Sequence, residues 1–163
     1  MKSEAIKKLE TLAFEALRAK YPNTPLQYLP CERFNDKTAN QLTKSIIAWL
    51  KLNGHFAQRV NTVGLPVDKR KTFTDVLGNT RQIGRIEWRK SNTELGASDI
   101  VANINSKFVA IEIKMKDRQS EHQKNYQQKI EASGGTYILI RSFEEFYNWY
   151  QNENPGGKPG QIG

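Results

Sequence analysis

Residues 99–116 read DIVANINSKFVAIEIKMK, and the rest of the chain is organised around them. The first part is rich in β-branched residues and the second alternates apolar with polar residues, which predicts two antiparallel strands. The Asn-Ser pair at 105–106 suits a tight turn between these strands. With a two-residue turn, counting outward places Asp99 directly opposite Glu112, and Lys114 shares their face because strand residues alternate. The stretch therefore predicts a β-hairpin that carries two carboxylates and an ammonium group on one face.

Two opposed carboxylates repel each other across a strand pair. At a Cβ separation of about 5 Å and an effective dielectric of about 20, the repulsion is roughly 3 kcal/mol. A bound Mg²⁺ or Mn²⁺ would offset it, since a few oxygen ligands and several waters suffice for such an ion. The ammonium group of Lys114 offers a second explanation, in which the three side chains are an ordinary charge cluster on a solvated sheet face. The pattern leaves both interpretations open.

The composition suits one domain of 163 residues with a modest core. The single cysteine, Cys31, cannot form an internal disulfide, and no apolar run approaches the length of a membrane span. We therefore expect a cytoplasmic protein without a membrane partner. A net charge of +8 favours a polyanionic partner.

Much of the positive charge lies between residues 51 and 90, where nine basic residues stand against three acidic ones. Apolar and aromatic residues alternate with the basic ones, as in strands that bind phosphates and stack on bases. An ordinary solvated basic surface is the alternative. The basic residues are Lys51, Arg59, Lys69, Arg70, Lys71, Arg81, Arg85, Arg89 and Lys90.

Periodicity and capping signals predict the elements around the central hairpin. They are helices over 4–20, 36–53, 120–132 and from 142 onward, and strands over 56–63 and 136–141. Ser3 is the expected N-cap of the first helix, and Asn35 or Asp36 that of the second. This order predicts an α/β sandwich with a mixed central sheet flanked by helices.

The chain should divide into three parts. Residues 1–35 form a helix and a proline-containing linker that pack on the body or on a partner. Residues 36–151 form the main domain, with a basic hairpin insertion at about 64–95. Residues 152–163 are rich in Gly and Pro and should be a flexible tail.

Four short motifs stand in a recognisable order: GASD at 96–99, EIK at 112–114, QSEHQKNY at 119–126 and GGTYILIRSFEEF at 134–146. With these motifs, over roughly 36–150, the chain resembles the VRR-NUC branch of the PD-(D/E)XK nuclease superfamily, in its small phage or prophage form. It is also similar to Holliday-junction resolvases of the same fold. The resemblance implies a restriction-endonuclease-like sandwich and a metal-dependent DNA endonuclease.

The resemblance also implies roles for the residues of the central hairpin. Asp99, Glu112 and the backbone carbonyl of Ile113 would coordinate Mg²⁺ or Mn²⁺. Lys114 would orient or deprotonate the attacking water and offset charge in the transition state.

Two residues of the next predicted helix have more than one interpretation. Gln123 matches a family glutamine that helps to position substrate or water, but Ser120-x-x-Gln123 is also a capping box. Tyr126 lies on the same helical face as Gln123 and could contact DNA or belong to the core. The residues expected to contact DNA are Arg59, Lys69, Arg70, Lys71, Arg81, Arg85, Arg89, Lys90, Lys116 and Tyr126.

The chain departs from the family at one point. The family usually has a glutamate early in the helix before the first strand, where this chain has Ala39 and Asn40. The amide oxygen of Asn40 could hold a metal-bound water, or Asp36 or Glu94 could replace the missing acid. Such a site would have fewer charges and a weaker affinity for the metal.

The motifs and the missing glutamate leave three possible functions. The first is a Mg²⁺- or Mn²⁺-dependent endodeoxyribonuclease of phage or mobile-element type, acting at branched, flapped or junction DNA in a bacterial or phage-infected cell. We expect it to form a homodimer, with the N-terminal helix as the contact surface. The second is a nuclease-fold DNA-binding module that is catalytically weak or inactive, which the missing glutamate favours. The third is a sequence-specific restriction-type enzyme, for which the chain has no recognisable target-recognition module.

Overall fold

The computed structural model has the predicted α/β class, with a mixed sheet flanked by helices. It describes residues 2–61, 64–89 and 93–154. The chain forms two compact units, one made of Met1–Val60 together with Gly96–Gly163 and the other of Asn61–Leu95. The first unit holds the sheet and its helices, and the second is built from short strands alone.

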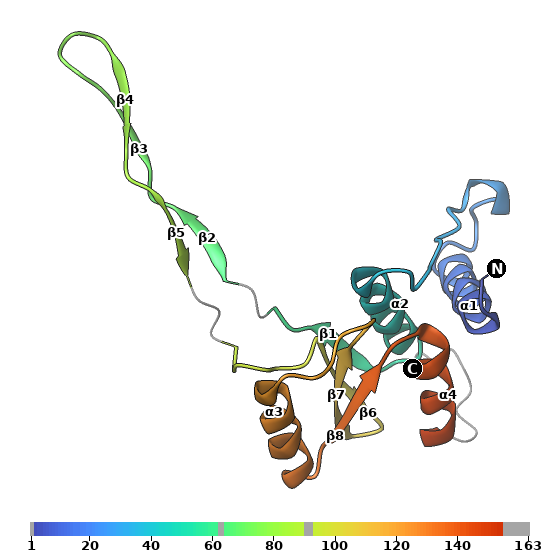
Figure 1. Ribbon diagram of the computed structural model, residues 1–163. Helices are drawn as coiled ribbons and strands as arrows, with labels where there is room; N and C mark the ends of the chain where they lie inside the picture. The colour runs from blue at the N-terminus through green and yellow to red at the C-terminus, as the bar shows by residue number, and fades with distance from the viewer. Residues whose placement is uncertain (1, 62–63, 90–92, 155–163) are drawn as a thin grey trace. The chain divides into compact units, whose positions relative to one another are not determined.

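The central sheet has four strands in the order β1-β6-β7-β8 (Figure 1). They are β1 (Phe56–Arg59), β6 (Ile100–Ile104), β7 (Lys107–Ile113) and β8 (Thr136–Ile140). β8 runs parallel to β7, and the other neighbours are antiparallel. The sheet is therefore mixed, as predicted.

β6 and β7 form the predicted hairpin. The turn residues Asn105 and Ser106 have φ values of 50° and 66°. Positive φ at both central positions is what a two-residue turn of type I′ requires. Ile100 pairs with Ile111, which confirms the predicted register.

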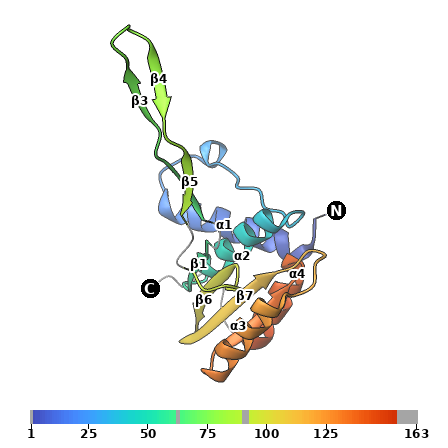
Figure 2. The same cartoon turned by 60° about the vertical axis from the view of Figure 1, so that its left-hand side comes forward.

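Helices cover both faces of the sheet. α2 (Ala39–Leu52) packs on β1, β6 and β7, α4 (Phe143–Glu153) packs on β8, and α1 (Glu4–Lys20) covers α2 and α4. The core on this side includes the fully buried Leu9, Leu42, Ile46, Leu50, Ile100, Ile111, Phe143 and Phe146. α3 (Glu121–Ala132) lies beside β8 (Figure 2). No helix in the described ranges is long and apolar enough to cross a membrane.

α1 uses its apolar stripe within the chain. Ala5, Ile6, Leu9 and Leu12 are buried, and the Ser3 hydroxyl caps the helix by accepting a hydrogen bond from the N–H of Ile6 at 3.4 Å. The stripe packs against α2 and α4. A dimer contact is therefore not needed to explain why this helix is amphipathic.

α2 begins later than predicted. Its N-cap is Thr38, whose hydroxyl accepts a hydrogen bond from the N–H of Gln41 at 3.3 Å, and not Asn35 or Asp36. Asp36 instead accepts a hydrogen bond from the N–H of Phe143 at 3.0 Å, in the first turn of α4. The acid was assigned to the wrong helix because a cap for a helix distant in the chain cannot be told from a local one.

β1 is shorter than the predicted strand over 56–63. It ends at Arg59, and the next N–H, that of Val60, donates to the carbonyl of Asp99 at 2.8 Å. The chain then enters the second unit at Asn61. Residues 62–63 lie outside the described part of the chain.

The C-terminal helix extends into the predicted tail at 152–163. α4 continues to Glu153, and Asn154 is buried and donates its side-chain amide to the carbonyl of Tyr150 at 2.8 Å. Residues 152–154 therefore belong to the folded unit. The remaining residues, 155–163, lie outside the described ranges, and so does the prediction that they are flexible.

The second unit consists of two antiparallel strand pairs in series, which we call the ribbon (residues 65–89). β2 (Leu65–Asp68) pairs with β5 (Ile86–Arg89), and β3 (Lys71–Thr74) pairs with β4 (Thr80–Ile83). Between the pairs, Gly84 has a φ of 107°, and a Cβ there would lie 2.4 Å from the backbone oxygen of Lys69, which links β2 to β3. Only glycine fits this crossing point.

Candidate active site

Asp99 stands directly before β6 and is held by the backbone. Its Oδ2 accepts a hydrogen bond from the N–H of Ile113 at 2.9 Å, and its carbonyl accepts one from Val60. The β6–β7 register places it opposite Glu112, as predicted. Its other carboxylate oxygen, Oδ1, makes no hydrogen bond with any described residue. Asp99 therefore has one oxygen held by the protein and one open.

Glu112 shows the same division in a more buried position. It is 3% exposed, and its Oε1 accepts a hydrogen bond from Nε2 of Gln123 and lies 3.4 Å from Nζ of Lys114. Its Oε2 is buried and has no hydrogen-bond partner in the described part of the chain. Burial, followed by the negative charge of Asp99, raises the pKa of Glu112 to about 7, although Lys114 acts in the opposite direction. A buried, unpartnered carboxylate oxygen is unfavourable unless something supplied from outside binds it.

Lys114 completes the predicted cluster. Its side chain is 16% exposed, and its backbone N–H donates to the carbonyl of Ile140 at 3.0 Å, which continues the parallel pairing with β8. The three charged side chains do not lie on a solvated sheet face, since Glu112 and Lys114 are both largely shielded from water, but Lys114 does pair with Glu112 as the alternative supposed. Ile113, between them, donates its N–H to Asp99. All four predicted hairpin residues therefore meet at one end of the hairpin.

The loop at 96–98 fixes Asp99 against α3. Gly96 has a φ of 81°, and a Cβ at this position would lie 2.3 Å from the carbonyl oxygen of His122. Ser98 is fully buried and donates its hydroxyl to the carbonyl of Ile100 at 3.1 Å. These contacts explain why the GASD motif has a glycine at position 96 and a serine at position 98.

Gln123 links α3 to the carboxylates. Its Oε1 accepts a hydrogen bond from the N–H of Ser120 at 2.9 Å, and the Ser120 hydroxyl accepts one from the N–H of Gln123, which confirms the capping box. Its Nε2 donates to Glu112. One side chain therefore caps the helix and holds Oε1 of the carboxylate, so the two interpretations of Gln123 are compatible.

Sequence analysis missed Tyr137. It pairs with Ala110 across β7 and β8, so its side chain shares a sheet face with Glu112. Its hydroxyl is buried without a hydrogen-bond partner among the described residues, and burial, followed by the charge of Glu112, raises its pKa. The ring of Tyr126 meets that of Tyr137 edge-on at 6.4 Å, so the predicted DNA contact Tyr126 is partly buried between α3 and β8. Alternation within 136–140 could have assigned Tyr137 to a face, but only the strand order shows which face.

Two of the candidates for a third metal ligand have partners of their own. The amide oxygen of Asn40 accepts a hydrogen bond from Arg59 at 2.9 Å, and Asp36 accepts one from the N–H of Phe143 at 3.0 Å. Glu94 belongs to the second unit. No group of three His, Cys, Asp or Glu side chains arranged to hold a metal occurs within the ranges described. Asp99 and Glu112 are thus the two carboxylates that the described residues bring together at the end of the hairpin.

These residues nevertheless fit a divalent ion. Asp99 and Glu112 each present one oxygen that the protein leaves unbound, and hard oxygen ligands suit Mg²⁺ and Mn²⁺. Mg²⁺ keeps several of its waters and is commonly bound through one or two carboxylates. An ion at this place would neutralise the repulsion between the two acids and satisfy the orphaned Oε2.

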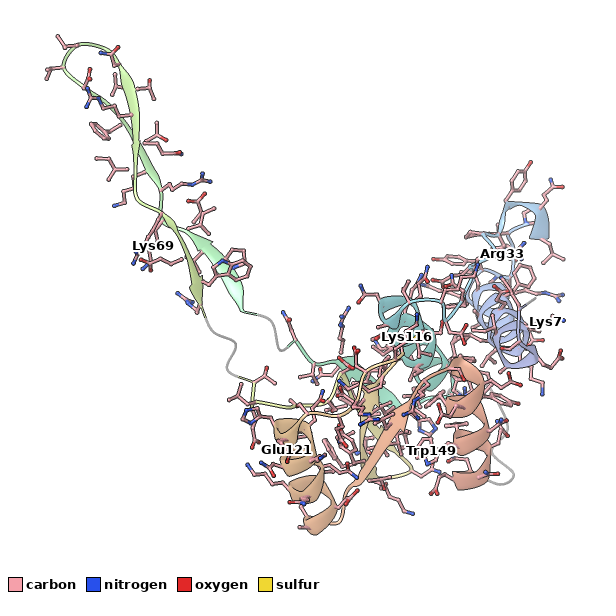
Figure 3. The ribbon with its side chains drawn as sticks, viewed as in Figure 1. Lys7, Arg33, Lys69, Lys116, Glu121 and Trp149 are labelled. Atoms are coloured by element: carbon pink, nitrogen blue, oxygen red, sulfur yellow. The ribbon has the colours of Figure 1, made fainter. Side chains whose placement is uncertain are left out.

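The predicted DNA contacts fall in both units. Arg59 and Lys116 belong to the unit with the carboxylates, where Lys116 follows β7 and is exposed (Figure 3). Lys90 lies outside the described residues. Apart from the partly buried Tyr126, the others are exposed on the ribbon: Lys69, Arg70, Lys71, Arg81, Arg85 and Arg89.

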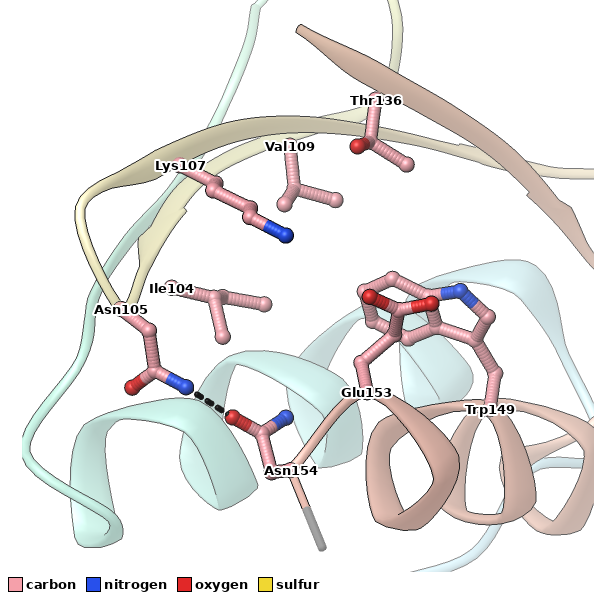
Figure 4. A pocket seen from close by; sticks show the side chains of 8 residues that line it. All are labelled: Ile104, Asn105, Lys107, Val109, Thr136, Trp149, Glu153 and Asn154. Atoms are coloured by element: carbon pink, nitrogen blue, oxygen red, sulfur yellow. Dashed lines mark hydrogen bonds between the residues drawn. The ribbon is translucent and has the colours of Figure 1, made fainter.

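A cavity at the opposite end of the hairpin is too small to be a second candidate active site. It has a volume of about 40 Å³ and lies between the β6–β7 turn, the start of β8 and the end of α4 (Figure 4). Asn105 donates a hydrogen bond to Asn154 beside it, and Trp149 forms part of its wall. Such a volume holds only a few waters.

Comparison with known proteins assigns no family to the chain. No protein-family model matches it, and no curated protein matches it. Its function must therefore be inferred from the chemistry of the site.

Proposed function

We propose that the chain is a metal-dependent DNA endonuclease of PD-(D/E)XK type that hydrolyses phosphodiester bonds with Mg²⁺ or Mn²⁺. The observation that carries this proposal is the opposed pair Asp99 and Glu112, in which each carboxylate has one oxygen held by the protein and one left open. The resemblance of the motifs at 96–99, 112–114 and 119–126 to the VRR-NUC branch supports the same assignment.

Each residue of the cluster has a distinct role in this proposal. Asp99 and Glu112 would hold the metal, with the carbonyl of Ile113 as a further ligand. When bound, such an ion lowers the pKa of water and neutralises the scissile phosphate. The N–H of Ile113 and the amide of Gln123 keep the two carboxylates oriented by binding their other oxygens. Lys114 offers its ammonium group to the attacking water and to the charge that develops on the phosphate.

DNA is the proposed partner. The net charge of +8 and the exposed cations of the ribbon favour a polyanion. Preference for branched, flapped or junction DNA, phage or mobile-element origin, action in the cytoplasm of a bacterial or phage-infected cell and a homodimeric state are parts of the proposal supported by the resemblance alone.

One observation favours a second candidate, a DNA-binding module with little or no activity. Ala39 and Asn40 stand where the family has a glutamate, and the amide oxygen of Asn40 is already bound by Arg59. A site without the third acid would hold its metal more weakly. The distinction between the two candidates is therefore one of activity and not of fold.

The deciding experiment measures cleavage of labelled linear, flapped and four-way-junction DNA in Mg²⁺ and in Mn²⁺. The wild-type chain is compared with Asp99→Ala, Lys114→Ala and the matched surface control Lys20→Ala, in which an exposed lysine at the end of α1 is lost. We expect metal-dependent cutting that the first two variants lose and the control retains.

Other outcomes separate the candidates. Salt-sensitive binding without cutting in either metal would replace the nuclease by the binding module. Cutting that persists in Asp99→Ala would refute the assigned site. A wild-type chain that neither binds nor cuts any of these DNAs would overturn both candidates.

A further inference from the structure

The ribbon presents two faces of different chemistry. Directly paired residues of antiparallel strands share a face. On one face of the β3–β4 pair, basic and apolar residues stand opposite each other, as Lys71 with Ile83 and Phe73 with Arg81. The other face carries only neutral hydroxyl and amide side chains: Thr72, Thr74, Thr80 and Gln82. All of these residues are exposed, and Figure 3 shows their side chains along the ribbon beyond the labelled Lys69.

The tip of the ribbon is an ordered turn that exposes two apolar side chains. The carboxylate of Asp75 accepts hydrogen bonds from the N–H groups of Leu77 and Asn79 at 3.0 and 2.9 Å, and the carbonyl of Asp75 accepts one from Gly78 at 3.0 Å. Val76 is 103% exposed and Leu77 is 82% exposed. The turn therefore holds a valine and a leucine at the apex of the ribbon, where they contact nothing in the chain that would shield them from water.

The charge of the ribbon is positive once internal pairs are removed. Its acids are each paired with a ribbon cation: Asp68 with Arg70 at 2.6 Å, Asp75 with Arg81 at 3.2 Å, and Glu87 with Lys69 at 2.5 Å and Arg85 at 3.4 Å. Lys71 and Arg89 form no ion pair with the residues that the structure describes. The ribbon thus combines unpaired cations with an apolar tip.

We propose that the ribbon enters a groove of double-stranded DNA and that Val76 and Leu77 insert between base pairs as a wedge. Two-stranded ribbons fit DNA grooves, and apolar wedges that unstack a base step are a known way of kinking a duplex. Lys71, on the same face as Phe73 and Ile83, would contact the phosphate backbone. This inference rests on the proposed DNA substrate. It specifies duplexes whose base stacking is already interrupted, because a wedge enters such a step most easily.

The wedge predicts a preference for duplexes with an unstacked step. Binding is measured in EDTA by fluorescence anisotropy, on an intact duplex and on one with a two-base mismatch that carries 2-aminopurine beside it. The wild-type chain should bind the mismatched duplex at least about tenfold more tightly, since the free energy of unstacking the step need not be supplied by the protein. Its binding should also raise the 2-aminopurine fluorescence, which reports loss of stacking.

The variant Val76→Ser/Leu77→Ser should lose this preference and the fluorescence change while keeping its affinity for the intact duplex. Both side chains are exposed, so the variant should fold normally, as circular dichroism can verify. The matched control Leu26→Ser/Tyr28→Ser removes two other exposed apolar side chains, 54% and 70% exposed, from the first unit and should behave as wild type.

A second variant, Lys71→Ala/Arg89→Ala, separates backbone contact from the wedge. It should bind both duplexes more weakly and lower the salt dependence of log K by about 2, because two phosphate contacts are lost. The mismatch preference should remain.

Three results would overturn the proposal. If Val76→Ser/Leu77→Ser keeps the mismatch preference, the tip is not a wedge, although the nuclease assignment is untouched. If that variant instead changes the sedimentation of the protein from dimer to monomer, the tip contacts a second copy of the chain. If the wild-type chain binds neither duplex, the proposed DNA substrate fails together with the wedge.

Discussion

Replacing Glu112 with glutamine should stabilise the metal-free protein and remove its response to Mg²⁺. The substitution keeps the size of the side chain and an oxygen that can accept the hydrogen bond from Gln123. It removes the negative charge that faces Asp99 in a position 3% exposed to solvent. The substitution should therefore raise the free energy of unfolding in the absence of metal and reduce the further stabilisation that Mg²⁺ provides.

The magnitude follows from the pKa of Glu112. Burial and the charge of Asp99 raise this pKa from 4.5 to about 7 in the folded chain. The folded protein then binds the proton more tightly than the unfolded chain does, so the contribution of Glu112 to stability is present at acidic pH. It is lost as the pH rises from about 4.5 to about 7. The shift corresponds to on the order of 3 kcal/mol, and we expect about 1–3 kcal/mol after relaxation of the site.

Urea unfolding followed by circular dichroism measures this difference. In EDTA, Glu112→Gln should exceed wild type in free energy of unfolding at pH 8 and match it near pH 4.5. The control Glu15→Gln removes an exposed acid from the middle of α1 and should follow wild type at both pH values. Adding Mg²⁺ at pH 8 should stabilise wild type and the control, because a ligand that binds only the folded state shifts the equilibrium toward it.

Two results would refute this reasoning. If Glu112→Gln is less stable than wild type at pH 8 in EDTA, the carboxylate is satisfied in the metal-free protein, and the open Oε2 has no significance. If Mg²⁺ stabilises the variant as strongly as wild type, the ion binds elsewhere.

Three further substitutions test the surroundings of the site. Tyr137→Phe removes an unpartnered buried hydroxyl, so it should leave the free energy of unfolding unchanged or raise it by up to about 1 kcal/mol. It should also lower metal-dependent cleavage, and unchanged cleavage would show that the hydroxyl has no role at the site. In urea titrations, Gly96→Ala should lower the free energy of unfolding by about 1–3 kcal/mol more than Gly134→Ala does. Both glycines have nearly the same positive φ, but only Gly96 meets a backbone oxygen of α3, and equal losses would show that this contact is relaxed. Asp36 binds the N–H of Phe143 in addition to the N-cap Ser142, so Asp36→Ala should cost about 1 kcal/mol and weaken the hydrogen-exchange protection of the first turn of α4; protection lost in α2 instead would contradict this contact.

The hairpin and its register could be predicted because both depend on local signals. Strand alternation assigns faces, and a two-residue turn at 105–106 leaves one register, so the opposition of Asp99 and Glu112 followed without knowledge of the rest of the fold. The capping box of Ser120 and Gln123 is local as well. Each of these predictions involves residues that are close in sequence or joined by one turn.

The features that could not be predicted depend on contacts between distant segments. Tyr137 reaches the site because β8 pairs in parallel with β7, and no local pattern specifies the neighbour of a parallel strand. Asp36 caps a helix that follows it far along the chain. The contact of Gln123 with Glu112 likewise needs the packing of α3 on the sheet, whereas its cap does not.

The environment of Glu112 bears on the two explanations that the sequence allowed for its charge, a bound metal and the ammonium group of Lys114. If Lys114 alone offset the charge, its ammonium group would lie on the oxygen that lacks another partner. It lies instead 3.4 Å from Oε1, which Gln123 also binds, and leaves Oε2 buried and unbound. A buried carboxylate oxygen without a hydrogen-bond partner is unfavourable even when the other oxygen of the group is bound. The backbone N–H of Ile113 likewise occupies one oxygen of Asp99 and leaves the other open. Hydrogen bonds that take one oxygen from each acid and leave the other open do not neutralise the pair; in the proposed function, the open oxygens are the ones that would bind the divalent cation.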